Sequence, residues 1–338
     1  MKKEQLEELL SQLTTDEKLG MIHGNELFAT KGVERLGIPP FITSDGPRGV
    51  RKDFNPDNWN EIGQSYDYVS YLPCAVLANG VPVPINLKAE NDFRLTAEEL
   101  EAAITPKTKL LVMPFPNNPT GAIMEKKDLE AVAEVVKKHD LFVISDEIYS
   151  ALTYTEKHIS IASLPGMKER TIVINGFSKS HAMTGWRLGY ACGPRIILDQ
   201  MLKIHQYAIM CAPTTSQYAA VDALRAGDED VQRMREEYNG RRRYLMHRFE
   251  EMGLECFEPY GAFYCFPCIK EFGMTSEEFA TNLLKTEKVA VVPGTAFGDC
   301  GEGFIRISYA YSLDNLKEAL DRMERYITGL RGGNNGEA

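Results

Sequence analysis

The chain has 338 residues, of which 43% are hydrophobic and 25% charged, and a formal net charge of -10. This length is enough for two or three domains at roughly 100–200 residues each, and the composition is ordinary for a globular protein. The acidic balance argues against nucleic acid or an anionic membrane as a partner, because both are approached through basic patches. No apolar run approaches the ~20 residues needed to cross a bilayer. The start lacks a secretory signal, which predicts a cytoplasmic protein.

The first 79 residues contain the segment FITSDGPRGVR at 41–51, followed by SYLPCAVLA at 70–78. This part of the chain resembles the N-terminal beginning of family 3 glycoside hydrolases, the β-glucosidase type. The resemblance implies that Asp45 and Arg48 hold sugar hydroxyls. Glycoside hydrolysis needs two carboxylates across the scissile bond, and a complete barrel needs about 250 residues. A turn aspartate and a solvated arginine are therefore the favoured alternative.

Strands alternate with helices from Val81 onward, which predicts βαβ units, a parallel sheet and an α/β fold. The expected elements are a strand at 109–113, a helix at 128–140 and strands at 141–145 and 171–174. Because parallel strands end at one edge of the sheet, Asp146 and Lys179 are predicted to lie on the same edge. Open α/β sheets bind their ligands there.

Lys179 stands in a polar turn directly after the β-branched run at 171–174. A lysine in such a crevice suits a Schiff-base nucleophile, which must be a neutral amine to attack an aldehyde. For a lysine taken alone, a solvated surface position is the more frequent alternative.

The residues around Lys179, GFSKSHAMTGWRLG, match the pyridoxal-phosphate lysine signature of class I/II aminotransferases in spacing and residue type. Five further motifs follow the same family order: PFPNNPTGAIM at 114–124, VISDEIYS at 143–150, YGAFYCFP at 260–267, VVPGTAFG at 291–298 and FIRISYA at 304–310. Residues from about 80 to 330 thus resemble this family. The resemblance implies a fold type I protein with a three-layer αβα large domain, N-terminally incomplete, and a smaller α+β C-terminal domain.

The resemblance also assigns roles to the residues that hold the cofactor's ring. Lys179 is the catalytic residue, which forms the Schiff base with pyridoxal phosphate and moves the proton at the substrate Cα. Asp146 is the partner of the pyridinium nitrogen, with a helix N-cap as the alternative. Asn118 and Tyr149 hydrogen-bond the cofactor's 3-oxygen, and their alternatives are a turn asparagine and an ordinary half-buried tyrosine.

The phosphate and the substrate involve three further residues. Arg187 matches the arginine that binds the phosphate, with Ser178 as a nearby hydroxyl. Arg306 matches the arginine that binds the substrate carboxylate, which implies α-amino acids and α-keto acids as substrates. A solvated strand face is its alternative. No metal site is predicted, because the pair Cys265 and Cys268 has no second pair at a finger spacing.

The domain organisation follows from the same pattern. We expect a glycosidase-like fragment at 1–79, a partial cofactor-binding domain at 80–235, a small domain at 236–330 and a disordered tail at 331–338. Helices are expected at 236–253, 276–285 and 313–330, with short strands around Phe263, Val291 and Ile305. The triplet Arg241, Arg242 and Arg243 is interpreted as a solvated helix face.

The family pattern is broken before Val81, because residues 1–80 contain neither the phosphate-cupping helix nor the ring-stacking aromatic of the family. We interpret the chain as a chimera, with a short large-domain sheet whose exposed edge and apolar surface predict poor solubility. A homodimer is expected from the family, although much of its contact belongs to the portion that is not found. A carbon-sulfur β-lyase on the same scaffold and an inactive remnant with a non-functional glycosidase fragment are the alternatives.

Overall fold

The structure of the protein, a computed structural model, describes residues 24–26, 29–30 and 71–333. The chain divides into two compact units, Met1–Pro82 and Val83–Ala338. The described elements of the first unit are the antiparallel strands β1 (Gly24–Glu26) and β2 (Ala29–Thr30) and the helix α3 (Tyr71–Leu77). The residues expected to hold a sugar, Asp45 and Arg48, lie outside the described residues.

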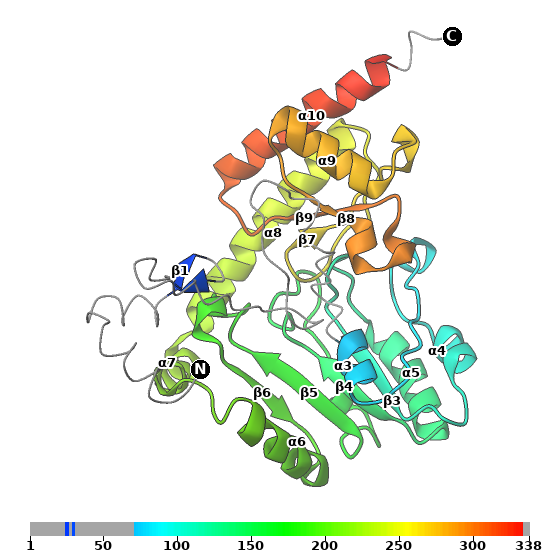
Figure 1. Cartoon of the computed structure of the whole chain (residues 1–338), viewed down its shortest axis with the longest axis vertical. Helices are drawn as coiled ribbons and strands as arrows, with labels where there is room; N and C mark the ends of the chain where they lie inside the picture. Colours follow the sequence, from blue (N-terminus) through cyan, green and yellow to red (C-terminus); the bar gives the residue numbers. More distant parts are fainter. Residues whose placement is uncertain (1–23, 27–28, 31–70, 334–338) are drawn as a thin grey trace, which may run out of the picture. The chain divides into compact units, whose positions relative to one another are not determined.

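A four-stranded sheet forms the centre of the second unit (Figure 1), with the strand order β3-β4-β5-β6. Its members are β3 (Leu110–Pro114), β4 (Phe142–Asp146), β5 (Thr171–Gly176) and β6 (Gly189–Cys192). The first three strands are parallel, as the sequence predicts, whereas β6 runs antiparallel to β5. Pro114, Asp146 and Ile174 stand side by side in the register, so β3, β4 and β5 reach the same edge.

Helices α4 (Ala97–Ala103) and α5 (Lys126–Lys138) begin at capping boxes, formed by Thr96 with Glu99 and by Glu125 with Asp128. A capping box satisfies backbone N–H groups that the first turn leaves without partners. The apolar positions of α5 repeat at helical spacing, and Val132 and Val136 are completely buried. Burial of such a side chain contributes about 1.5–3 kcal/mol. α5 is thus the crossover that joins β3 to β4.

A smaller antiparallel sheet of order β7-β9-β8 forms the C-terminal part of this unit. Its strands are β7 (Tyr264–Cys265), β8 (Val292–Pro293) and β9 (Ile305–Ser308), and its helices are α9 (Ser276–Glu287) and α10 (Leu313–Gly333). The 24-residue helix α8 (Asp228–Glu251) runs from the four-stranded sheet to this smaller one (Figure 1). The two sheets of the second unit are therefore joined by one continuous helix.

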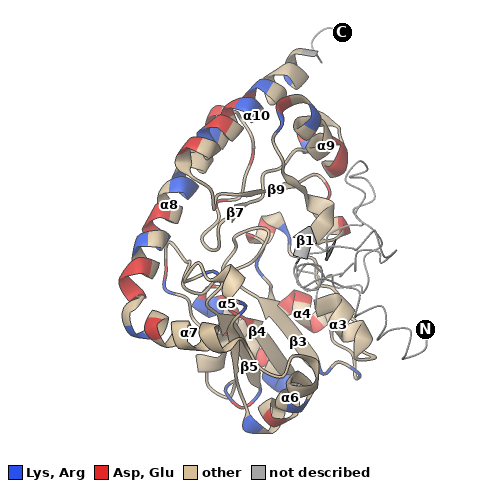
Figure 2. Cartoon of the chain, turned by 60° about the vertical axis from the view of Figure 1, so that its left-hand side comes forward, with Lys and Arg blue, Asp and Glu red and all other residues tan. Residues whose placement is uncertain are grey.

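Charged residues lie along α8 and α10 (Figure 2), and two arginines of α8 are buried among them. Arg248 donates to Asp321 at 2.6 Å and to Glu324 at 2.9 Å, which joins the end of α8 to α10. Arg242 donates to Glu258 at 2.5 Å and is only 6% exposed. The interpretation of the Arg241–243 triplet as a solvated face is therefore wrong for Arg242, because its carboxylate partner compensates for burial.

Helices α6 (Arg195–Ala208) and α7 (Thr214–Ala226) follow β6 and carry large exposed apolar side chains. Ile204 is 72% exposed and Tyr207 is 94% exposed on α6, and Tyr218 is 74% exposed on α7. Within the described residues, β3 and β6 each pair with one neighbour only. These features agree with the expected exposed edges and apolar surface. No helix of the described residues combines the length and the apolar content that a membrane span requires.

Replacing Ile204 and Tyr207 together with lysine should increase the soluble fraction of the chain, because contiguous exposed apolar surface promotes self-association. The measurement is light scattering of the purified protein during a concentration series. The matched control is lysine at Gln200 and Gln206 of the same helix, which adds the same charge without removing apolar surface. A parent chain that stays monodisperse and melts cooperatively without aggregation would contradict this prediction.

Candidate active site

Four of the predicted site residues lie in loops or strand ends at the carboxyl edge of the four-stranded sheet. Asn118 follows β3, Asp146 ends β4, Tyr149 comes three residues later, and Lys179 follows β5. Because the three strands are parallel and in register, their following loops emerge together. The prediction that Asp146 and Lys179 share one edge is confirmed.

Lys179 lies against two aromatic rings. Its Nζ is 5.7 Å from the centroid of the Tyr149 ring and 5.7 Å from that of Phe263. Tyr149 is 1% exposed, and its ring meets Phe263 edge-on at 5.4 Å. Aromatic faces attract a cation through their quadrupole and limit its access to water. The lysine is thus half-buried beside the tyrosine predicted to bind the same cofactor, and the solvated-surface alternative is wrong.

Arg306 reaches the same place from β9 of the smaller sheet. Its Nη1 donates to Asn118 Oδ1 at 3.1 Å, across 188 residues of sequence. Its guanidinium carbon lies 4.6 Å from the centroid of Tyr264 and 5.0 Å from that of Phe297. Its Nε is buried and has no hydrogen-bond partner in the described part of the chain. A buried donor without a partner is costly, so this fork is suited to a carboxylate that would satisfy it.

Thr184 connects Ser178 and Arg187 by hydrogen bonds in the turn between β5 and β6. The Thr184 hydroxyl donates to the Ser178 carbonyl at 2.8 Å, and the Thr184 carbonyl accepts from Arg187 Nη1 at 3.0 Å. Arg187 is exposed and has a left-handed backbone with φ 53°. The two residues predicted to bind phosphate therefore share one turn, and the arginine keeps donors that face solvent.

Gly176 explains why β5 and β6 can approach so closely at this turn. A Cβ at Gly176 would lie 2.9 Å from Gly189 Cα and 3.0 Å from the Leu188 carbonyl oxygen. Such distances leave no room for a side chain. The glycine therefore permits the close approach that places the Ser178–Arg187 turn at the sheet edge.

Asp146 and Glu147 are both buried at the end of β4, 9% and 4% exposed. Asp146 Oδ1 accepts from the Ile148 amide at 3.1 Å, an Asx-type turn contact, and a turn follows Asp146 rather than the helix that the N-cap alternative requires. Glu147 accepts from Ser145 at 2.9 Å and Ser160 at 2.6 Å and lies 3.0 Å from His158 Nε2. Burial alone would raise the pKa of Glu147, but the contacts with His158 and Ser160 outweigh it, so its pKa lies below the ordinary value of 4.5.

The unfolding free energy of the Glu147→Gln variant should depend less on pH than that of the parent chain. Because the folded pKa of Glu147 is below the unfolded one, its carboxylate stabilises the native state above pH 4.5 and loses this effect as the pH falls through the folded pKa. We expect a loss of about 1–3 kcal/mol in unfolding free energy near neutral pH and a smaller loss in acid. Urea unfolding at several pH values measures this, with exposed Glu156→Gln as the control. A destabilisation that stays constant with pH would contradict it.

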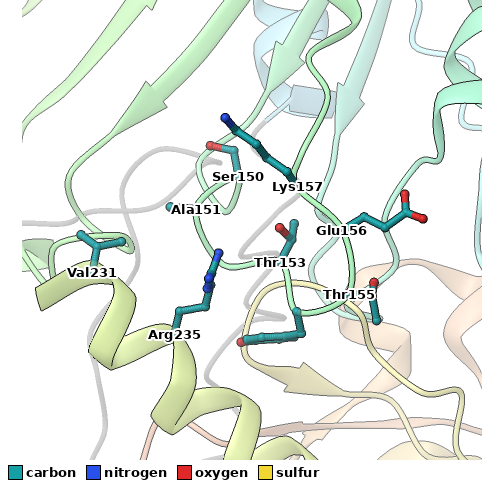
Figure 3. Close-up of a pocket in the computed structure, with 9 residues that line it drawn as sticks. Ser150, Ala151, Thr153, Thr155, Glu156, Lys157, Val231 and Arg235 are labelled. Atoms are coloured by element: carbon teal, nitrogen blue, oxygen red, sulfur yellow. The ribbon is translucent and has the colours of Figure 1, made fainter. Parts of the chain in front are cut away.

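A separate pocket of about 370 Å³ lies between the loop 150–157 and α8. Figure 3 shows Val231 and Arg235 of α8 facing the loop that carries Ser150 and Thr153. Ser150 Oγ accepts from Asn175 Nδ2 at 2.9 Å, which connects the pocket wall to β5. None of the predicted site residues lines this pocket. It is a neighbour of the candidate site and not part of it.

Comparison with known proteins shows the family of the chain. The family described as aminotransferase class I and II matches residues 62–323. The chain belongs to this family. The aspartate aminotransferase of Pyrococcus abyssi is 51% identical over 265 residues, which are 77% of this chain and 68% of the relative. The aromatic-amino-acid aminotransferase 2 of Thermococcus litoralis is 48% identical over 277 residues, which are 81% of this chain and 71% of the relative.

A solved aromatic aminotransferase from Pyrococcus horikoshii OT3 is 48% identical, with a TM-score of 0.76 over 79% of this chain and 72% of that chain. The class I and II aminotransferases are fold type I enzymes that depend on pyridoxal phosphate, so the predicted fold class, cofactor and enzyme class are confirmed. The family match begins at residue 62 and therefore includes the last part of the segment assigned to 1–79. The glycosidase resemblance receives no support from these comparisons.

The residues present fit pyridoxal phosphate in the chemistry of their donors. The sheet edge carries a buried carboxylate in Asp146, an amine in Lys179 and hydroxyl and amide groups in Tyr149 and Asn118. These groups suit a pyridinium nitrogen, an aldehyde and a phenolic oxygen respectively. Arg306 Nε is a buried donor without a hydrogen-bond partner among the described residues, which suits an acceptor such as a carboxylate. No group of three metal-ligating side chains occurs in the described ranges.

Sequence reasoning assigned no role to three aromatic residues of this aminotransferase site. Phe263, Tyr264 and Phe297 surround Lys179 and Arg306. Two of them fall in the motif YGAFYCFP and the third in VVPGTAFG, so the signal was present. What the sequence lacked was the tertiary arrangement, such as the pairing of β7 with β9, which places Tyr264 beside Arg306.

Proposed function

We propose that this chain moves an amino group from an α-amino acid to an α-keto acid, with Lys179 as its catalytic residue. The observation that carries the proposal is the contact between Arg306 and Asn118, which brings a carboxylate-binding fork to the edge that holds Lys179. Pyridoxal phosphate, when bound, supplies the electron sink that stabilises negative charge at the substrate Cα. Which amino acid donates and which keto acid accepts would depend on the contacts of their side chains.

Three roles belong to side chains near the ring of the cofactor. Lys179 would hold the cofactor covalently between turnovers and move the proton at the substrate Cα. The Asp146 carboxylate would keep the pyridine nitrogen protonated, since a nearby negative charge favours the charged form. Tyr149 and Asn118 would donate to the 3-oxygen.

Two further roles concern the phosphate of the cofactor and the carboxylate of the substrate. Arg187 and Ser178 would bind the phosphate, which agrees with their shared turn and with the solvent-facing donors of the arginine. Arg306 would bind the substrate carboxylate in a bidentate manner. The hydrogen bond from Arg306 to Asn118 supports this role, because it brings the arginine close to the residue proposed for the 3-oxygen.

Titration of the purified chain with pyridoxal phosphate tests this proposal through visible absorption, followed by amino donors with 2-oxoglutarate as acceptor. We expect a saturable band and formation of the corresponding keto acid. Ammonia and pyruvate from a cysteine-type substrate without any acceptor would instead assign the chain to the carbon-sulfur lyases. Absence of both the band and the products would identify an inactive remnant.

Other features of the proposal rest on the sequence. A cytoplasmic location and a homodimer are proposed from the family. Domain limits of 80–235 and 236–330 are proposed because they separate the four-stranded sheet from the small one. A glycosidase-like origin of residues 1–79 is supported only by the resemblance of its sequence, through Asp45 and Arg48.

A further inference from the structure

Tyr264 joins two parts of the candidate site that come from different sheets. It is the first residue of β7 and is 7% exposed. Its hydroxyl lies 3.0 Å from the Tyr149 hydroxyl at the edge of the four-stranded sheet. Its ring lies 4.6 Å from the guanidinium carbon of Arg306 on β9. One side chain thus contacts both the expected 3-oxygen site and the expected carboxylate site.

The position of Tyr264 follows from the register of the small sheet. Tyr264 pairs with Ser308 in the antiparallel ladder of β7 and β9. The residue two positions along a facing strand lies on the same face, within reach of an aromatic side chain. For Tyr264 that residue is Arg306. Replacing Tyr264 therefore changes the surroundings of the arginine without altering its place in the strand.

We propose that Tyr264 is a positioning residue that fixes the substrate-binding Arg306 relative to Tyr149. This inference rests on the proposed function, because it assumes the roles given there to both residues. The aromatic ring and the hydroxyl make separate contributions. The ring supports the guanidinium by stacking, as Phe297 does from its own position. The hydroxyl supports Tyr149, which becomes a better donor when its oxygen accepts a hydrogen bond.

Two variants separate these contributions. Tyr264→Leu removes the ring and should weaken binding of maleate, a non-reacting dicarboxylate, to the cofactor-free chain by about tenfold, the usual scale of a desolvated cation–π contact. Tyr264→Phe keeps the ring and should leave maleate affinity within about twofold. Calorimetric titration measures both dissociation constants. Circular dichroism of each variant verifies that it is folded.

The hydroxyl has a spectroscopic signature in the chain loaded with pyridoxal phosphate. Either hydroxyl of the Tyr149–Tyr264 pair can be the donor, and when Tyr149 donates to the cofactor's 3-oxygen, Tyr264 is the one that donates to Tyr149. Tyr264→Phe removes this donor, so Tyr149 would stabilise negative charge on the 3-oxygen less well and the protonated form should persist to higher pH. A pH titration of the visible absorption detects this upward shift. This titration of Tyr264→Phe still tests the positioning role if Tyr264→Leu does not fold.

Tyr309→Phe is the matched control, because it removes an equally buried tyrosine hydroxyl that donates to the Ala262 carbonyl at 3.2 Å. It should change neither maleate affinity nor the spectral titration. Equal maleate affinity in Tyr264→Leu and Tyr309→Phe, or an unshifted titration in Tyr264→Phe, overturns the positioning role. A parent that binds maleate but gives no saturable band contradicts the proposed function alone. A parent that gives the band and the keto acid but does not bind maleate overturns the carboxylate site at Arg306 and the positioning role, and leaves amino transfer standing.

Discussion

Lys179→Ala should abolish amino transfer, with kcat reduced at least about 10³-fold, because one side chain would supply both the covalent attachment and the proton transfer at the substrate Cα. The saturable visible band obtained with pyridoxal phosphate should disappear together with activity. The Lys179 amine lies against the Tyr149 and Phe263 rings. An alanine side chain at position 179 is too short to reach a ligand bound there. Half-reaction kinetics and absorption measure the two effects independently.

Lys168→Ala provides the comparison, since this lysine is exposed in the turn before β5 and touches none of the site residues described above. It should keep both the band and the rate. Added methylamine is a second check, because a free amine can replace part of the missing proton transfer. A Lys179→Ala chain that retained the parent rate would show that another group performs the chemistry.

Arg306→Lys should raise KM for both the amino acid and the keto acid by about 10- to 100-fold, although the charge is conserved. A lysine presents a point charge and lacks the planar fork that binds a carboxylate with two parallel hydrogen bonds. It would also lose the stacking between Tyr264 and Phe297. Steady-state kinetics with each substrate varied in turn measures the change.

The absorption band of the bound cofactor should be retained in Arg306→Lys, because this residue contacts the expected substrate site. Arg325→Lys is the control at an exposed ion pair with Glu287, where exchange of the two cations should leave KM unchanged. An unchanged KM in Arg306→Lys would mean that the substrate carboxylate binds elsewhere.

Much of the site was predictable because parallel strands impose a simple geometry. Asp146 and Lys179 each follow a buried strand, and strand direction alone places them on one edge. The contact of Arg306 with Asn118 spans 188 residues and could not come from local pattern. The resemblance of both motifs to one family assigned the two residues to one site, but it did not predict the contact between them.

Other features depend on tertiary contacts that periodicity does not encode. Two partners of Glu147, His158 and Ser160, come from a loop more than ten residues away. The burial of Arg242 depends on Glu258 across a turn. Exposure of Ile204 and Tyr207 is a property of what surrounds α6 and not of its sequence, which is that of an ordinary amphipathic helix. The residues assigned to sugar binding lie outside the described part and stay predictions.

The long helix α8 runs from the four-stranded sheet to the smaller sheet. Its 24 residues span about 36 Å at 1.5 Å per residue. Arg248 joins the far end of α8 to α10 through its hydrogen bonds with Asp321 and Glu324. We therefore expect the small sheet to move together with that end of α8. A tilt of about 5° displaces a point about 20 Å along such a rod by nearly 2 Å, enough to separate a hydrogen-bonded pair. We therefore expect that a change in the angle of α8 would separate Arg306 from Asn118.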